Sequence, residues 1–278
     1  MARSDAPAMR PASTAEASFA RRAADYATGA YGVAAAEVQK LRHDPLELVT
    51  RALQPVLWLL LFGEVMAQVR GMSQGSLRYL DFLSAGILAQ SVLFVAIFYG
   101  ISAIWERDLG VLQRYLVSPA PRSAIVIGKA LSASVRALSQ ATIVYILALL
   151  LGVGIDLDPV NIAGVVIVIG LGSALFSTFS LVIACFVKTR ERFMGIGQVL
   201  TMPIFFASNA IYPLALMPAW LRAVSHLNPL TYEVDALRAL MLQGSTSTYG
   251  IGMDYLVLVL ISGVLVYIAS RAYPHVVV

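Results

Sequence analysis

The segment Trp105–Arg122, WERDLGVLQRYLVSPAPR, places charged and apolar side chains together between two long apolar runs. Leu109, Leu112 and Leu116 recur at three- and four-residue spacing, which predicts one apolar face of a short helix. Acidic residues at its beginning suit the helix dipole, and Pro119 would help to end it before the next span. A cytoplasmic partner could grip such a helix and push on it. The alternative is a connector that lies on the membrane surface.

Catalytic and nucleotide-binding patterns are missing from the sequence. It contains no Gly-x-x-x-x-Gly-Lys-Ser/Thr loop, so ATP hydrolysis, if involved, belongs to another chain. His43, His226 and His275 are scattered, and the single cysteine, Cys185, lies in an apolar run, so no zinc or disulfide framework is indicated. We therefore expect no catalytic residue, no metal and no cofactor bound by this chain. An intramembrane enzyme stays an alternative, because a catalytic triad assembles in space.

The second segment with mechanistic content is Asn209–Gly244. Prolines break its apolar run before one straight helix can finish, and Asn228 followed by Pro229 is typical of a helix start. The pattern predicts two short, half-buried external helices that form a lid, with Asp235 close enough to Arg238 to pair. A simple extracellular hairpin is the alternative. The expected gate residues are Pro218, Asn228, Pro229, Tyr232 and Arg238.

Two ionisable residues, Glu64 and Arg136, are expected inside membrane spans. A charge at the centre of a bilayer costs about 2.5–3.5 kcal/mol on insertion scales, so each needs a reason. Arg136 either lines a transport pathway or reaches the inner surface with its long side chain. Glu64 lies near the outer end of its span and can reach water.

Composition defines the scaffold that must hold these segments. Of the 278 residues, 59% are hydrophobic and 13% are charged, whereas an ordinary soluble domain has about 25% charged residues. Lipid must therefore solvate much of the surface, which predicts an all-α polytopic membrane protein. Six uncharged or nearly uncharged runs predict six transmembrane helices over 51–272, at about 52–69, 82–105, 130–153, 159–187, 193–213 and 251–271.

The remaining parts are a mobile tail at 1–18, an interfacial amphipathic helix at 19–50 and a cytoplasmic tail at 273–278. A solvated helix leading into the first span is the alternative for 19–50. Basic residues concentrate in alternate connecting segments, which predicts cytoplasmic N- and C-termini by the positive-inside rule. The same bias explains the isoelectric point of about 9.3 without any nucleic-acid partner.

A family resemblance rests on two motifs and their order. Glu106-Arg107 is followed by Gly110, Leu112, Leu116 and Pro119, and then by Gly128-Lys129; later come Met217-Pro218, Asn228-Pro229-Leu230-Thr231-Tyr232 and Arg238. This arrangement resembles that of type-2 ABC transporter permeases of the drug, lipid and polysaccharide export group. The likeness runs from about Tyr31 to Arg271 and includes the number of spans and their orientation.

The resemblance implies partners and roles that periodicity does not show. Such permeases work in pairs, with a second copy or a sibling permease, in the plasma (inner) membrane amid lipid. Each contacts a separate ATPase subunit, which carries the ATP and the magnesium. The residues that would couple this chain to the ATPase are Glu106, Arg107, Asp108, Gly110, Leu112 and Leu116.

The leading hypothesis is thus the membrane-spanning subunit of an ATP-driven exporter for an amphipathic, lipid-like or drug-like substrate, with no enzymatic activity of its own. One alternative is an ion- or proton-driven carrier that needs no ATPase, for which Glu64 is the candidate acid. Another is a non-transporting membrane scaffold or immunity protein.

Overall fold

The computed structural model describes residues 50, 53–63, 65, 78–109, 122–187 and 189–272. Within these ranges the chain is helical apart from its loops and one isolated antiparallel bridge, Ile155–Leu242. The helices are η1 (Trp58–Phe62), α4 (Tyr79–Tyr99), α5 (Ile101–Asp108), α7 (Arg122–Leu150), α8 (Pro159–Phe186), α9 (Arg190–Phe206), η2 (Leu214–Leu216), α10 (Ala219–Leu227), α11 (Pro229–Met241) and α12 (Ile251–Ala272).

Four of these helical stretches are long and apolar enough to cross a membrane. They are Tyr79–Glu106, Val126–Leu150, Pro159–Phe186 and Ile251–Ala272, and they agree with the second, third, fourth and sixth expected spans. A shorter apolar helix, Leu53–Phe62, falls in the first expected span. The all-helical membrane architecture is confirmed, whereas the count of six spans and the orientation stay predictions.

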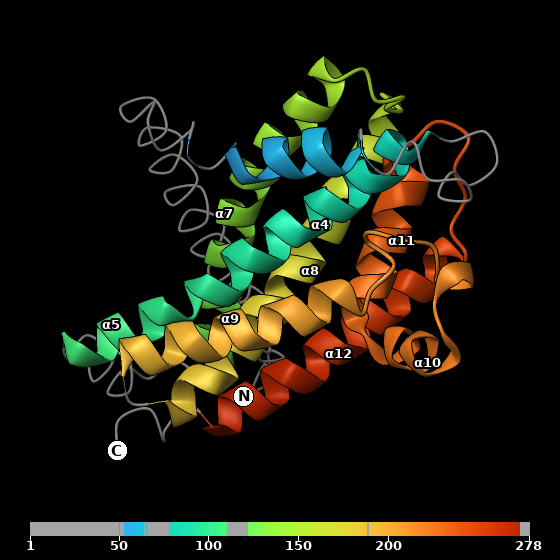
Figure 1. Ribbon diagram of the computed structural model, residues 1–278. Helices are drawn as coiled ribbons and strands as arrows, with labels where there is room; N and C mark the ends of the chain where they lie inside the picture. The colour runs from blue at the N-terminus through green and yellow to red at the C-terminus, as the bar shows by residue number, and fades with distance from the viewer. Residues whose placement is uncertain are drawn as a thin grey trace, which may run out of the picture.

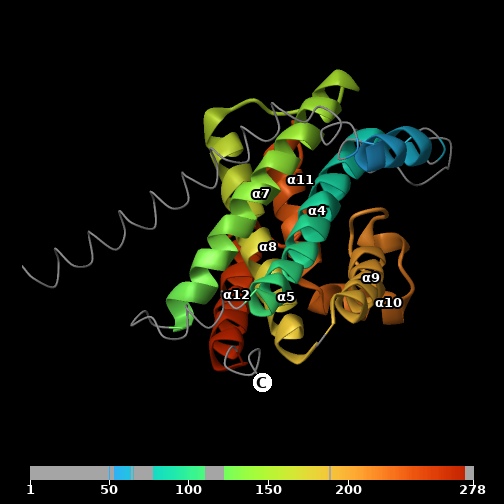
Figure 2. The same ribbon diagram turned by 90° about the vertical axis from the view of Figure 1, so that its left-hand side faces the viewer.

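Helix α8 lies at the centre of the bundle, in contact with α4, α7, α11 and α12 (Figures 1 and 2). Its start is marked in the sequence, because Asp158 caps it by accepting a hydrogen bond from the Val160 amide, with Pro159 at the first helical position. Small residues allow close approach: Gly100 contacts Ser180, and an added Cβ at Gly164 would lie 3.0 Å from the Leu240 side chain. Close packing of this kind replaces the hydrophobic driving force that lipid cannot supply.

The fifth expected span, 193–213, is corrected at its outer end. Helix α9 has 17 residues and ends at Phe206, and residues 208–211 are buried with non-helical backbone. Tyr79 Oη donates to the Ile211 carbonyl at 2.9 Å, and the Ser208 hydroxyl caps the turn by accepting from the Ala210 amide. These contacts satisfy backbone groups that a continuing helix would have satisfied itself, and only protein cover makes that possible inside a membrane.

Several expected elements lie outside the described residues. They are the tail at 1–18, the amphipathic helix at 19–50 except Thr50, the coupling helix over 110–121, and the C-terminal tail at 273–278. In Figure 1, α5 and the beginning of α9 lie at one end of the bundle, while α10 and the C-terminal end of α11 lie toward the other.

Candidate functional site

An ion pair joins the two helices that flank segment 110–121. Lys129 Nζ of α7 lies 2.5 Å from Glu106 Oε2 of α5. Both side chains are largely buried, at 12% and 27% exposure. Because a hydrogen bond between charged groups away from water contributes about 1.5–3 kcal/mol, this contact holds α5 against α7.

A second ion pair joins α5 to α9. Arg190 donates to Asp108 Oδ2 at 2.8 Å, and its guanidinium lies over the Trp105 ring, 3.6 Å from the ring centroid. Arg190 is at the first turn of α9, where Thr189 caps the helix by accepting from the Arg192 amide. The pair is more exposed than the first, so the cation–π contact is an important part of its stability.

We call these five residues, Trp105, Glu106, Asp108, Lys129 and Arg190, the α5 clasp. The clasp gives two of the predicted coupling residues a specific contact, since Glu106 binds α7 and Asp108 binds α9. For Arg107 the structure describes the backbone alone, and Gly110, Leu112 and Leu116 lie outside the described residues. The clasp therefore joins α5, which precedes segment 110–121, to both α7 and α9.

Replacing Arg190 with alanine is expected to loosen the α9 side of the clasp by about 0.5–1 kcal/mol, the usual range for a partly exposed pair. Loss of the guanidinium uncovers the Trp105 ring, so acrylamide should quench Trp105 fluorescence more strongly in a Trp58→Phe, Trp220→Phe background. Arg192→Ala, at an exposed position of the same turn, is the matched control. Equal quenching in both variants would contradict the contact.

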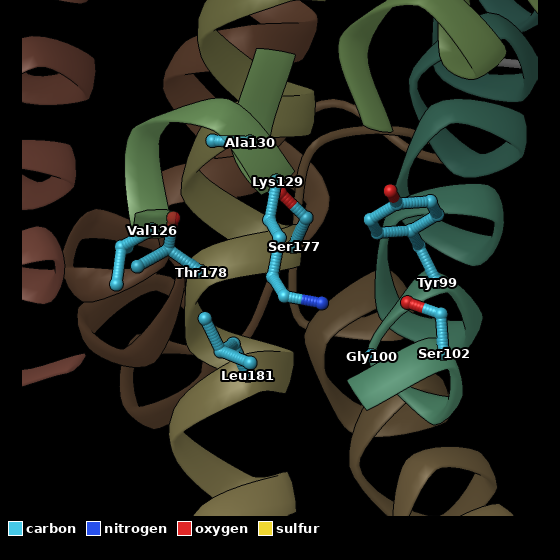
Figure 3. Close-up of a pocket in the computed structure, with 9 residues that line it drawn as sticks. All are labelled: Tyr99, Gly100, Ser102, Val126, Lys129, Ala130, Ser177, Thr178 and Leu181. Atoms are coloured by element: carbon cyan, nitrogen blue, oxygen red, sulfur yellow. The ribbon is translucent and has the colours of Figure 1, made fainter. Parts of the chain in front are cut away.

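A small cavity lies beside the clasp, where α4 and α5 meet α7 and α8 (Figure 3). Its volume is about 10 Å³, close to the minimum that holds one water. The Lys129 ammonium and the Ser102 hydroxyl point toward the gap in Figure 3. The hydroxyls of Ser102 and Thr178 have no hydrogen-bond partner in the part of the chain that the structure describes. The cavity therefore suits a single water rather than a substrate.

Arg136, the predicted pathway residue, lies on α7 two turns beyond Lys129. It is half-buried, and its guanidinium is 5.8 Å from the centroid of the Tyr99 ring of α4. The residue therefore faces the α4–α7 contact. Its role in a pathway stays a prediction.

At the other end of the bundle, Asn228 joins α9, α10 and α11. Its side-chain oxygen Oδ1 caps α11 by accepting from the Leu230 amide at 3.0 Å. Its side-chain nitrogen Nδ2 donates to the Ile204 carbonyl of α9 at 2.6 Å. Pro229 occupies the first position of α11, as the sequence predicts. Pro218 is the residue just before α10 rather than its first helical residue.

Tyr232 holds α11 against the end of α10. Its hydroxyl donates to the His226 carbonyl at 2.8 Å, and its ring lies 5.0 Å from that of Tyr249. The Tyr249 hydroxyl is 2.7 Å from His226 Nδ1. Burial, together with the nearby Tyr232 and acidic groups, raises the pKa of Tyr249 to about 12, so the phenol keeps its proton at neutral pH.

Arg238 is an internal anchor. It is 5% exposed, donates to the Asn209 carbonyl at 2.9 Å and lies 3.8 Å from the centroid of the Phe82 ring. It therefore ties the non-helical segment after α9 to α4 and α11. The expected pair with Asp235 is wrong, because the Asp235 carboxylate accepts instead from Ser247, Thr248 and Tyr249.

Removing the Asp235 carboxylate with Asp235→Ala is expected to free the loop before α12, at a cost of about 1–3 kcal/mol for the donors left unpaired. The amides of Thr248 and Tyr249 donate to it at 2.6 and 3.2 Å. Hydrogen exchange at these two amides should accelerate, and Asp235→Asn, which keeps one acceptor oxygen, should accelerate them less. Unchanged exchange in the alanine variant would refute this role.

Sequence reasoning missed several functional groups. In the sequence, Lys129 was recognised only as part of a family motif, and Arg190 was not singled out. Their partners, Glu106 and Asp108, lie 23 and 82 residues away along the chain. The expectation that Glu64 and Arg136 are the ionisable residues inside spans overlooked Asp81 and Asp254, which lie in the first turns of α4 and α12, and Glu64 itself lies outside the described residues. Glu233, fully buried in α11, carried no recognised signal either.

Comparisons of the sequence with known proteins identify the family. Residues 31–242 match the family model described as ABC-2 type transporter. A transport permease of Cyanophora paradoxa, ycf38, is 32% identical over 72% of this chain and 70% of its own length. The daunorubicin resistance ABC transporter permease protein DrrB1 of Streptomyces coeruleorubidus is 25% identical over 76% of this chain and 74% of its own. The multidrug ABC transporter permease YbhR of Escherichia coli is 29% identical over 64% of this chain and 48% of its own. The chain belongs to the ABC-2 type transporter family and is the membrane subunit of an ABC transporter.

Proposed function

We propose that this chain is the permease subunit of an ATP-driven exporter that carries an amphipathic, lipid-like or drug-like substrate across the plasma (inner) membrane. The observation that carries the proposal is the α5 clasp, which ties α5, the helix before segment 110–121, to α7, the helix after it, and to α9. A separate ATPase subunit docks on that segment and supplies the ATP and the magnesium. The substrate passes between this chain and a second permease, either an identical copy or a sibling.

The clasp explains how work done by the ATPase reaches the membrane. A push on segment 110–121 moves α5, and the Glu106–Lys129 and Asp108–Arg190 pairs transfer the motion to α7 and α9. Because α9 leads into the buried non-helical segment and then α10, the same motion reaches the opposite end of the bundle. We propose that residues 207–241 form the external lid that opens there.

The class of substrate follows from what the helices lack. Helix α8 carries no charged residue, and the acidic groups of α4 and α12 are held by partners near the helix ends. A fixed charge for a charged substrate is thus not offered by these helices, which favours apolar cargo. The names of two relatives, one a daunorubicin resistance permease and the other a multidrug permease, support a drug-like molecule as one member of this class.

The test is to purify the tagged chain from its native host in mild detergent, identify the proteins that co-purify, and assay ATP hydrolysis. We expect a stoichiometric ATPase whose association is lost when Glu106 and Arg107 are replaced. A chain that purifies alone without hydrolysis would favour the ion-driven carrier or the scaffold. In that case Glu64→Gln separates the two, because it should abolish transport only in a carrier that uses this acid.

A further inference from the structure

Glu233 is an acidic side chain in a place where an ionised acid has nothing to stabilise it. It is 0% exposed, and neither carboxyl oxygen has a hydrogen-bond partner among the residues that the structure describes. The carboxyl contacts Gly172, at the middle of the 28-residue α8, and a Cβ there would clash with it. A carboxylate buried without a partner is strongly disfavoured, so the carboxyl binds a proton while α11 is docked on α8.

Among the residues that the structure describes, the helices packed against α11 supply no counter-ion to Glu233. Helix α8, which provides the contact, has no charged residue. The titratable groups of the elements packed against α11 have other partners. On α4, Tyr79 donates to the Ile211 carbonyl and Asp81 pairs with Arg78; on α12, Tyr255 donates to the Gly164 carbonyl and Asp254 accepts from Ser247. On α10, Arg222 donates to the Leu214 carbonyl and His226 contacts Tyr249. On α11 itself, Asp235 and Arg238 bind the loop before α12 and the Asn209 carbonyl. Tyr99, Cys185 and Arg271 lie toward the opposite ends of α4, α8 and α12.

The position of Glu233 on α11 makes its protonation depend on docking. Helix α11 runs antiparallel to α8. Glu233, early in α11, contacts Gly172 at the middle of α8, whereas Leu240, late in α11, contacts Gly164 in the first third of α8. Glu233 is therefore in the half of α11 that reaches deepest along α8. Separation of α11 from α8 would expose this carboxyl to water that enters between the two helices.

We propose that Glu233 is a proton-binding site that couples docking of α11 on α8 to the uptake of one proton. When α11 leaves α8, the hydrated carboxyl regains an ordinary pKa of about 4.3 and releases its proton at neutral pH. The docked state binds one more proton than the undocked state, so docking is favoured at low pH. Its equilibrium constant falls as the pH rises above that value, by up to tenfold per pH unit. Any effect of this proton on export rests on the proposed external lid. Proton binding by Glu233 does not depend on that proposal.

Infrared spectroscopy of the full chain in lipid nanodiscs tests the protonation. The carbonyl stretch of a protonated carboxyl should be present at pH 7 in the parent and lost in Glu233→Gln, which keeps the shape of the side chain. Asp81→Asn is the matched control, since it removes a buried carboxyl that has a counter-ion and should leave the band intact. An identical band in the parent and Glu233→Gln would overturn the proposal and indicate an ionised carboxylate held by a cation.

Cross-linking tests the coupling. In a Cys185→Ser background, Gly164→Cys and Leu240→Cys bring two thiols together across α8 and α11, because a Cβ at Gly164 lies 3.0 Å from the Leu240 side chain. From pH 6 to pH 9 the cross-linked fraction should fall relative to the same pair carrying Glu233→Gln, which corrects for thiol reactivity. Equal fractions at every pH would overturn the coupling. Neither measurement needs an ATPase or a substrate, so loss of export alone would count against the proposed function and not against this site.

Discussion

Lys129→Glu is expected to abolish export while leaving the chain in the membrane. The substitution places two carboxylates where Lys129 Nζ and Glu106 Oε2 now lie 2.5 Å apart, so attraction between α5 and α7 becomes repulsion. Losing the charge-assisted hydrogen bond costs about 1.5–3 kcal/mol, which corresponds to a tenfold or larger loss of coupling between α5 and α7. The measurement is substrate export together with substrate-stimulated ATP hydrolysis in proteoliposomes.

Two variants show whether the clasp itself is responsible. Lys129→Arg keeps the charge and should retain most of the activity. The double variant Glu106→Lys, Lys129→Glu restores opposite charges across the same two helices and should recover export that either single reversal loses. If the double variant is no better than Lys129→Glu, the ion pair is not the element that transmits the motion.

Gly86→Ala should disrupt the end of the bundle where the segment after α9 packs against α4. A Cβ at this position would lie 2.7 and 2.9 Å from the carbonyl carbon and the Cα of Ala210, closer than such atoms approach in proteins. These are backbone atoms, so the buried segment 208–211 must shift. Overpacking of this kind costs about 1–3 kcal/mol, and the shift would also separate Asn209 from Arg238.

The thermal unfolding midpoint in detergent should fall by several degrees, and export should decrease with it. Gly170→Ala is the matched control, because a Cβ there meets no atom within 4 Å and α8 gains a residue with better helix propensity. A Gly86→Ala protein as stable and active as Gly170→Ala would show that the segment after α9 moves freely. That outcome would contradict its role in a packed lid.

Long apolar runs were predictable because lipid imposes one simple requirement on a spanning segment. The run that starts at Pro159 needs only apolar side chains to suit the lipid and an Asp-Pro pair to begin the helix. Helix α8 begins at Pro159, as expected, and ends at Phe186, one residue before the expected end. Helix α12 follows the same logic and begins at Ile251, as expected. Caps are local too, which is why Asn228 was identified correctly from its neighbour Pro229.

The end of α9 was not predictable from local pattern. Residues 207–213 carry no charge, so a span was expected to continue through them, yet Tyr79, Gly86 and Arg238 supply contacts that hold the backbone in another conformation. Asp235 shows the same limit, because its spacing from Arg238 suits a pair, but four donor groups from three residues of the following loop reach it instead. A competing partner at long range decides such cases, and its position is known only once the helices are packed.

The sequence by itself therefore determined the membrane class, the family and four of the long helices, and it singled out two segments as candidates for mechanism, because composition and local capping are properties of neighbouring residues. Only the tertiary structure decided how these segments are connected. The partners of Glu106 and Asp108, the anchoring of Arg238, and the burial of Glu233 against Gly172 all depend on which helix faces lie together. Those faces are set by packing between distant segments, and a hydrogen bond forms only when packing has brought its two atoms to within about 3 Å.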